Sequence, residues 1–291
     1  KTQKTFVVSE RRACKSLGQP RSTQRYQAKT KDNEASLVRR IQELVREFPR
    51  YGYRMVTRVL RREGWTVNFK RIYRLWKREG LRIPVKKKKK RRLGSSSGGI
   101  KRRRAESMNH VWSVDFIFDR TTKGRSLKIL SLIDEYTREC IALEVSRRFT
   151  GDDLVALLVD VFTIRGVPHF IRSDNGPEFI SRRVRDFLAR IDVGTSFIEP
   201  GSPWENGYVE SFHSRLRDEC LSCEAFDTLA EAQEVIGQWR STYNHRRPHS
   251  SLDSLPPAEF AARCAASPPV AALLAPKRHN EHDLTPQSLP S

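Results

Sequence analysis

Along residues 35–82, apolar positions recur every three or four residues, which is the spacing of helices that bury one face. Three helices are predicted there, ended in turn by Pro49, Gly64 and Gly80. Asn68 stands where it can cap the third helix. Two short helices joined by a tight turn are typical of a helix-turn-helix, so this region is predicted to be all-α.

From residue 107 onward, short apolar runs separated by turn residues replace the helical spacing and indicate strands. The predicted strands are Trp112–Phe118, Ser126–Ile133, Cys140–Val145, Phe170–Ser173 and Thr195–Ile198. The predicted helices are one opened by a capping box of Thr150 and Asp153, Arg182–Arg190, one beginning at Ser202 or near Asn206, and Leu229–Tyr243. Three consecutive strands followed by alternating helices and strands favour an α/β fold, a mixed sheet with flanking helices.

Positive charge is concentrated in the first third of the chain. Residues 1–104 hold 34 Lys and Arg against 7 Asp and Glu, whereas residues 105–291 hold 21 against 27. A short helix is predicted at Ser9–Leu17 within the basic part. A basic segment joined to a mildly acidic one indicates that the first binds a polyanion, for which nucleic acid is the commonest partner.

The third predicted helix of the helix-turn-helix region carries a row of basic residues. They are Lys70, Arg71, Arg74, Lys77 and Arg78. We expect this helix to contact DNA; the alternative is a small helical bundle whose charges only face water. Residues 85–104 combine five consecutive lysines, several arginines and a Gly-Ser run, which predicts a flexible basic linker. A linker of this kind can lie along phosphates and make the affinity salt-dependent.

Several classes of protein are not expected. The sequence has no run of 18 apolar residues, so no membrane-spanning helix is predicted. The N-terminus lacks an apolar signal region, and the five cysteines are scattered and odd in number, so a cytoplasmic, nucleoid-associated protein is expected. No GxxxxGK[ST] phosphate loop occurs, so the chemistry is not expected to require ATP hydrolysis.

Three carboxylates stand in surroundings that suggest chemistry. Asp115 lies within the apolar run of the first predicted strand, where a charge is costly. Asp174 directly follows a short predicted strand, and Glu210 lies on a predicted helix. Carboxylate oxygens are hard ligands that suit Mg²⁺ or Mn²⁺, and two such ions about 3.5–4 Å apart can promote phosphoryl transfer.

Other candidate residues fit a site less well. Asp119 shares a strand face with the first of these carboxylates but lies roughly 13 Å along the strand, too far for a shared metal pair. Asp134 ends the neighbouring strand, where we expect it to form a turn. Cys220 and Cys223 form a lone CxxC pair, and even with His213 they fall short of the four ligands of a zinc site.

The motifs around these carboxylates resemble a known family. Three of them resemble the catalytic core of insertion-sequence transposases of the IS-three family and of retroviral integrases: Trp112-Ser-Val-Asp115, Ser173-Asp-Asn-Gly176 and Asn206-Gly-Tyr-Val-Glu210. The 35 residues between Asp174 and Glu210 match the spacing of this DDE group. Two further segments, Tyr243-Asn-His-Arg-Arg-Pro-His249 and Asn68–Leu75, resemble the C-terminal signature and the helix-turn-helix of the transposases. The resemblance covers about residues 35–262.

The resemblance implies a ribonuclease H-like core that cleaves DNA at the ends of an element and joins the freed 3′ hydroxyl to another strand. Asp115, Asp174 and Glu210 would be the catalytic residues and would hold two Mg²⁺ ions, for which Mn²⁺ can substitute. Arg217 falls where the family carries a basic residue, and we expect it to contact DNA together with Asn206.

The pattern of charge and predicted elements divides the chain into five segments, and the resemblance implies a set of partners. The expected segments are a basic N-terminal segment (1–34), a helix-turn-helix region (35–84), a basic linker (85–104), a catalytic core with C-terminal helices (105–262) and a loose tail (263–291). The expected partners are double-stranded DNA with terminal inverted repeats, target DNA, further copies of the chain on DNA, and a helix-turn-helix protein from an upstream frame, separate or fused. The alternatives are a catalytically silent DNA-binding relic and a structure-specific nuclease on the same fold.

Overall fold

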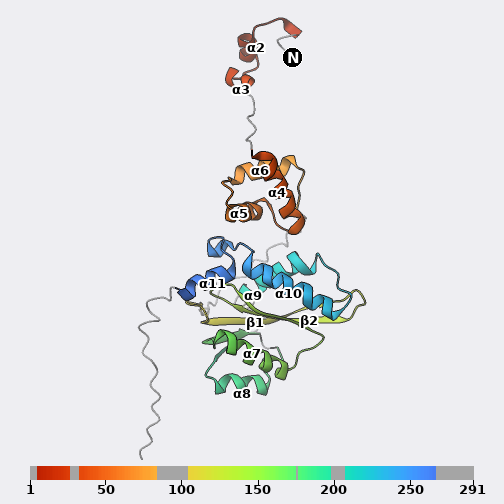
Figure 1. Cartoon of the computed structure of the whole chain (residues 1–291), viewed down its shortest axis with the longest axis vertical. Coiled ribbons are helices and arrows are strands. Elements are labelled where there is room, and N and C mark those ends of the chain that lie inside the picture. Colours follow the sequence, from red (N-terminus) through yellow and green to blue (C-terminus); the bar gives the residue numbers. More distant parts are fainter. Residues whose placement is uncertain (1–4, 27–32, 84–103, 175, 198–206, 267–291) are drawn as a thin grey trace, which may run out of the picture. The chain divides into compact units, whose positions relative to one another are not determined.

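The computed structural model describes residues 5–26, 33–83, 104–174, 176–197 and 207–266 of the chain. These residues belong to two compact units, Lys1–Phe48 and Pro49–Ser291, whose helices and strands are drawn in Figure 1. The expected basic linker lies outside the described residues except for Arg104. Asn206 also lies outside them.

Three helices form the described part of the N-terminal unit: α2 (Glu10–Ser16), α3 (Arg21–Arg25) and α4 (Glu34–Glu47). The first of them confirms the short helix that the sequence predicts there. Its cap is Ser9, whose hydroxyl accepts a hydrogen bond from the Arg12 N–H at 3.3 Å. Along α4, Leu37, Ile41 and Leu44 are fully buried, as their helical spacing requires.

The two short helices of the predicted helix-turn-helix are α5 (Tyr53–Arg62) and α6 (Phe69–Arg78), and they pack against each other. Asn68 caps α6 as expected, because its side-chain oxygen accepts the Lys70 N–H at 2.9 Å. Gly64 and Gly80 end the two helices in the left-handed conformation, with φ of +89° and +67°. Each predicted helix end in this region is therefore confirmed.

A five-stranded mixed sheet with the order β3-β2-β1-β4-β5 forms the centre of the second unit. Its strands are β1 (Val111–Arg120), β2 (Ser126–Asp134), β3 (Cys140–Ser146), β4 (Phe170–Ser173) and β5 (Gly194–Phe197). The first three strands pair antiparallel, whereas β4 runs parallel to β1 and β5 runs parallel to β4. The predicted mixed α/β sheet is confirmed.

Two helices, α7 (Gly151–Arg165) and α8 (Arg182–Arg190), cover one face of this sheet (Figure 1). Thr150 and Asp153 form the predicted capping box at the start of α7. Even-numbered residues of the strands, among them Trp112, Val114 and Leu132, are buried in the core beneath these helices. Side chains alternate across a strand, so the even positions of β1 and β2 belong to the α7 and α8 side.

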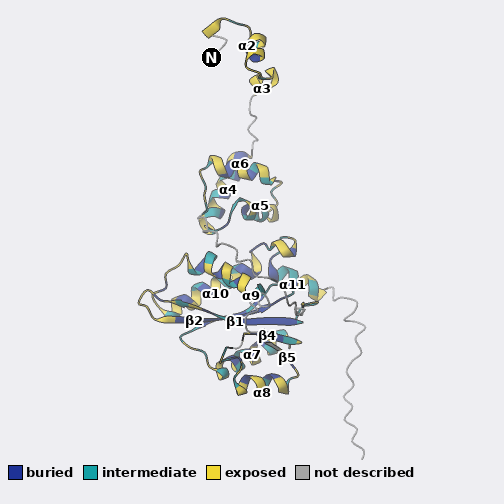
Figure 2. Ribbon diagram, turned by 180° about the vertical axis from the view of Figure 1, so that it is seen from behind, coloured by how far each residue is buried: buried dark blue, intermediate teal, exposed yellow. Residues whose placement is uncertain are grey.

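The opposite face is covered by α9 (Gly207–Leu216) and α10 (Leu229–His245), as Figure 2 shows from behind. A short π-helix, Arg217–Leu221, continues α9. Odd-numbered strand residues, among them Ile117 and Ile129, share a core with Val209 and Phe212 of α9. The odd positions of β1 and β2 therefore face α9 and α10, and Asp115 is one of them.

The last described helix is α11 (Pro257–Ala266). It corrects the expected start of the loose tail, because residues 263–266 are helical, and the Ala-rich sequence there has high helix propensity. The later residues of the expected tail lie outside the described part of the chain. Within that part, none of the helices combines the length and the apolar character that crossing a membrane would require.

Candidate active site

Asp115 and Asp174 come together because β1 and β4 are neighbouring parallel strands. Ser113 pairs with Arg172 in this ladder, and continuing the register by two residues places Asp174 beside Asp115. Adjacent strands lie about 4.8 Å apart, so the two residues are close neighbours on the sheet. Asp174 is exposed just after β4, and its Oδ1 accepts the Gly176 N–H at 2.9 Å.

The helix α9 supplies the third carboxylate. Val209 and Phe212 are buried against the sheet, which fixes the rotation of α9 about its axis. Glu210 lies in the first turn of the helix and is exposed. The negative charges of Asp174 and Glu210 both act on the Asp115 carboxyl group, so all three predicted residues belong to one neighbourhood.

Asp115 has an unusual electrostatic environment. Burial raises its pKa to about 6, and the neighbouring charges of Asp174 and Glu210 add to the rise. The Phe116 N–H opposes it by donating a hydrogen bond to Oδ1 at 2.7 Å. A bound cation would favour the ionised form of Asp115. The charge of the cation would therefore stabilise this carboxylate more than it would stabilise an exposed one.

The chemistry of the three side chains suits a divalent cation, since carboxylate oxygens are the ligands that Mg²⁺ and Mn²⁺ prefer. Among the residues that the structure describes, no three His, Cys, Asp or Glu side chains lie close enough together to hold a metal ion. The three carboxylates are therefore neighbours, but their oxygens are not arranged around one common metal position.

His213 is a member of this neighbourhood that the sequence considered only as a zinc ligand. Its Nδ1 lies 3.8 Å from Asp115 Oδ2, and its Nε2 lies 2.7 Å from the Ser131 hydroxyl. Ser131 is the cross-strand partner of Asp115, and its hydroxyl donates to the Asp115 main-chain oxygen at 3.1 Å. Burial, and then the positive charge of Arg217, lower the pKa of His213 to about 4, so the ring is neutral at pH 7.

A buried ion pair lies on the same side of the sheet, next to the carboxylates. The Arg172 guanidinium pairs with the Glu135 carboxylate, and both side chains are almost fully buried, at 3% and 0% exposure. The Ser113 hydroxyl donates a second hydrogen bond to that carboxylate. Arg172 is two residues before Asp174 and Ser113 is two residues before Asp115, so this pair joins the two strands beneath the site.

The weaker candidates have structural roles. The buried Asp134 carboxylate accepts the N–H groups of Tyr136 and Thr137 at 2.7 and 2.9 Å, which confirms the expected turn. Asp119 likewise accepts a local N–H, that of the next residue. Cys220 is buried and Cys223 is exposed, and the described residues contain no His/Cys/Asp/Glu group that could hold zinc.

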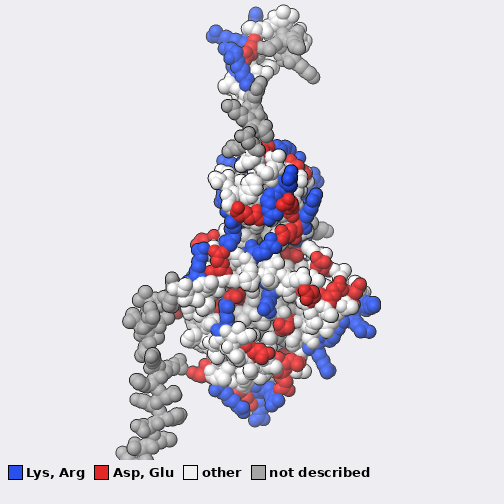
Figure 3. Space-filling model, in the orientation of Figure 1, with Lys and Arg blue, Asp and Glu red and all other residues white. Residues whose placement is uncertain are grey.

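Most of the residues expected to contact DNA are accessible. On α6, Lys70, Arg74 and Lys77 are exposed and Arg71 is partly buried. Arg217 is exposed at the start of the π-helix, where it is close enough to act on His213. Figure 3 shows a further group of basic side chains over α8, which consists of Arg182, Arg183, Arg185 and Arg190.

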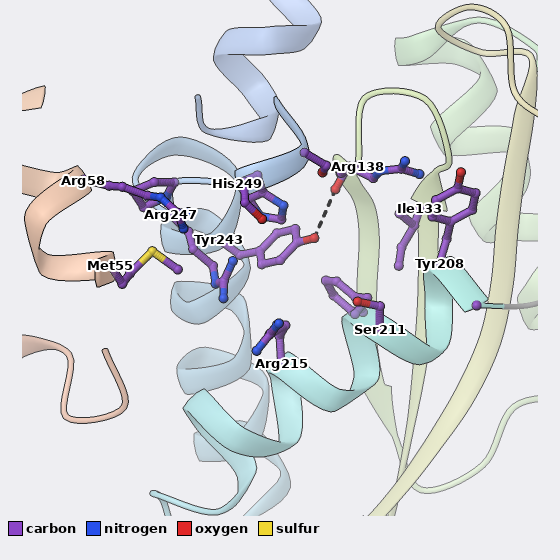
Figure 4. Close-up of a pocket in the computed structure, with 15 residues that line it drawn as sticks. Met55, Arg58, Ile133, Arg138, Tyr208, Ser211, Arg215, Tyr243, Arg247 and His249 are labelled. Carbon is purple, nitrogen blue, oxygen red and sulfur yellow. Dashed lines mark hydrogen bonds between the residues drawn. The ribbon is translucent and has the colours of Figure 1, made fainter. Parts of the chain in front are cut away.

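A pocket of about 410 Å³ lies beside the C-terminal motif (Figure 4). Arg138, Arg215, Arg247 and His249 line it, together with the Tyr208 and Tyr243 rings. Figure 4 shows these side chains on α9, on the end of α10 and the loop after it, and in the turn after β2. The sequence singled out the motif that contains Tyr243, Arg247 and His249, but not Arg138 and Arg215, which the motif meets in space.

His249 supports a prediction about pH. Burial, and then the charges of Arg247, Arg215 and Arg138, lower its pKa to about 3. Between pH 6.5 and 3 the unfolded chain takes up a proton here and the folded chain does not, so stability falls with falling pH and is unaffected above 6.5. The wild type should lose about 2 kcal/mol from this group between pH 7 and pH 5.

Urea unfolding at the two pH values checks this expectation. His249→Asn should lose about 2 kcal/mol less than the wild type over the same interval, since the other groups are unchanged. His245→Asn, at an exposed histidine on α10, should behave as the wild type does. An equal pH dependence in all three proteins would contradict the burial of a neutral His249.

The mixed sheet with its acidic neighbourhood belongs to an integrase core, as the family models show. Models of the integrase core domain match residues 105–203 and 191–257, and a model of an HTH-like domain matches residues 31–89. Among solved structures, the HTLV-2 integrase catalytic core domain in complex with magnesium aligns with 54% of this chain and 99% of that chain, at 18% identity and a TM-score of 0.44.

Relatives cover most of the chain. A 31.7 kDa protein of insertion element IS407 from Burkholderia multivorans is 39% identical over 263 residues, which are 89% of this chain and 93% of that protein. A 39.2 kDa protein of insertion element IS476 from Xanthomonas euvesicatoria is 40% identical, over 88% of this chain and 73% of that protein. The transposase for insertion sequence element IS904 from Lactococcus lactis is 28% identical, over 72% and 87%. The chain belongs to the IS-three family of insertion-sequence transposases.

Proposed function

We propose that this chain is a transposase that binds the ends of an insertion sequence, cleaves DNA there and transfers the freed strand to a target. The observation that carries the proposal is the convergence of Asp115, Asp174 and Glu210 from two parallel strands and a covering helix. Acidic residues from rigid elements suit a metal-dependent phosphoryl transfer. Family membership supports the same reaction class.

Asp115, Asp174 and Glu210 would hold divalent cations, with Mg²⁺ as the natural ion, Mn²⁺ as a substitute and two ions per site. When bound, such ions lower the pKa of an attacking water or 3′ hydroxyl and offset charge on the departing oxygen. Asp115 lies where burial makes its charge most sensitive to a cation, and the exposed Asp174 and Glu210 would face the bound DNA. No covalent protein–DNA intermediate is required.

DNA binding is assigned to the basic first third and to the core. Lys70, Arg74 and Lys77 project from α6, and Arg71 lies beside them. We include Asn206 and Arg217 as contacts near the catalytic carboxylates. The proposed segments keep the boundaries given above, except that α11 extends the C-terminal helices of the core to residue 266. Further copies of the chain are expected in the DNA complex, and an upstream-frame helix-turn-helix protein is a proposed partner or fusion.

Joining is the test that separates transposition from the other activities of this fold. The full chain is incubated with Mn²⁺ and labelled duplexes that carry the ends of its own element, together with a supercoiled target plasmid. Labelled strands joined to the plasmid would support the proposal. Cleavage without joining would favour a structure-specific nuclease, and binding without cleavage would favour a silent relic.

His213 is proposed as a positioning residue that orients Asp115 through the Ser131 hydroxyl. Partners that hold a metal-binding side chain typically contribute 10–100-fold to metal affinity or activity. His213→Ala should therefore lower the rate of plasmid nicking about 10–100-fold and raise the Mn²⁺ concentration needed for half-maximal rate. Gln can keep the hydrogen bond to the Ser131 hydroxyl, so His213→Gln should recover part of the rate.

Two comparisons decide whether His213 acts on the site. His245→Ala, on the exposed side of α10, should leave the rate and the Mn²⁺ requirement unchanged. A His213→Ala protein with wild-type rate, or with a lower rate that neither Mn²⁺ nor His213→Gln improves, would contradict the positioning role.

A further inference from the structure

The pocket beside the C-terminal motif gathers more positive than negative charge. Arg138, Arg215 and Arg247 line the pocket together with the half-buried His249, and their positive charges act on its ring. These four side chains are among those that line a space of about 410 Å³. A cavity of this size holds a group much larger than a water molecule.

The partners of these side chains leave a surplus of positive charge. Arg247 is neutralised, because its guanidinium makes a two-point contact with the buried Glu219 carboxylate at 2.6 and 2.8 Å. Arg138 lies over the Tyr208 ring, with its guanidinium carbon 3.7 Å from the ring centroid, and donates to the Glu135 main-chain oxygen. Neither contact of Arg138 supplies a negative charge.

Two groups in the pocket remain available to a ligand. Arg215 is exposed, and within the described residues it has no ion pair or hydrogen bond. His249 Nε2 is buried and has no hydrogen-bond partner in that same part of the chain. A buried polar atom without a partner is costly, so its position at the wall of a positive pocket points to an absent polar ligand.

The pocket lies away from the catalytic carboxylates. A helix turns 100° per residue, so Tyr208, Ser211 and Arg215 share one side of α9, while Glu210 and His213 share the other. A ligand in the pocket would therefore contact the same helix as the reacting phosphate but from its opposite side.

We propose that Arg138, Arg215, Arg247 and His249 form a phosphate site, here called the arginine pocket. It binds a backbone phosphodiester of the DNA that is remote from the phosphodiester that reacts. The assignment of this phosphodiester to DNA rests on the proposed function. Arg215 supplies the charge, Arg138 is held ready by Tyr208, and His249 offers its unpartnered ring nitrogen. The site gives the C-terminal motif a role in holding DNA on the rear side of α9.

The salt dependence of DNA binding tests the arginine pocket without relying on catalysis. Affinity for a random-sequence duplex is measured in EDTA at several salt concentrations for the full chain, Arg215→Gln and Arg190→Gln. Each lost phosphate contact should reduce the slope of log K against log salt by about 0.9. Arg215→Gln should show this loss and bind several-fold more weakly, whereas Arg190→Gln, at an exposed arginine on α8, should match the wild type.

Arginine footprinting identifies the source of the phosphate. Duplex DNA should protect Arg215 from phenylglyoxal while Arg190 still reacts, and inorganic phosphate alone at the same phosphate concentration should protect it less. Equal slopes for wild type and Arg215→Gln, equal losses in both variants, or equal protection by inorganic phosphate would overturn the proposal. A wild-type chain that binds DNA through Arg215 but neither cuts nor joins would instead refute the proposed function and leave the pocket standing.

Discussion

Glu210→Gln is expected to abolish metal-dependent nicking of a supercoiled plasmid while leaving DNA affinity unchanged. The substitution keeps the size of the side chain and removes the charge that would hold a divalent cation. Glu210 is exposed, and its neighbours Val209 and Phe212 fix the helix, so the fold should not change. The assay compares nicked and supercoiled plasmid with Mn²⁺ or Mg²⁺ and needs no knowledge of the element's ends.

A matched control distinguishes loss of the site from loss of negative charge in general. Glu224→Gln changes an exposed carboxylate beyond the π-helix and should nick as the wild type does. If wild type and Glu210→Gln nick at the same rate, the activity comes from a contaminant or another site, and the assignment of the carboxylates is wrong.

Arg172→Ala is expected to lower the free energy of unfolding more than any other substitution described above. It removes the cation that pairs with the Glu135 carboxylate in the interior, where both side chains of the pair are almost fully buried. Breaking a buried pair by removing one partner typically costs about 3–5 kcal/mol. Urea unfolding of the full chain, followed by circular dichroism, should show a matching fall in the midpoint.

Two further variants, one at an exposed ion pair and one with an apolar replacement of the buried pair, distinguish the effect of burial from the effect of charge. Arg183→Ala breaks the pair with Asp152, whose side chains are 78% and 67% exposed, and should cost about 0–1 kcal/mol. Replacing both members, by Arg172→Met with Glu135→Leu, removes the unpaired charge and should restore most of the loss. A loss below about 1 kcal/mol for Arg172→Ala would mean that water reaches Glu135 and that the pair does not support the strands beneath the site.

Local sequence rules predict much of this fold because the deciding interactions are local. The helix cap at Asn68, the capping box of Thr150 and Asp153, and the left-handed glycines each involve residues a few positions apart. The strands follow from runs whose two faces are both buried, as Trp112 and Ile117 on opposite sides of β1 illustrate. The three carboxylates could be proposed because their motifs, together with the 35-residue spacing between Asp174 and Glu210, are distinctive in combination.

Pairing between distant segments could not be predicted in the same way. Ser131 faces Asp115, and Glu135 meets Arg172, only because of strand register, which composition and periodicity do not specify. The contact of His213 with Asp115 depends on the rotation of α9, which buried side chains decide. The sequence patterns predict no separate helix over Pro257–Ala266, because an Ala-rich stretch fits an irregular tail as well as a helix.

The order in which the chain is made leaves the face of the sheet beneath α9 and α10 uncovered for part of synthesis. Ile117 and Ile129 leave the ribosome well before Phe212 and Tyr243, the residues that share their core. Until then, nascent strands present an apolar surface that other chains can cover. A product whose translation stops before α10 is therefore expected to aggregate or be degraded, so truncated copies would not compete with complete ones for DNA.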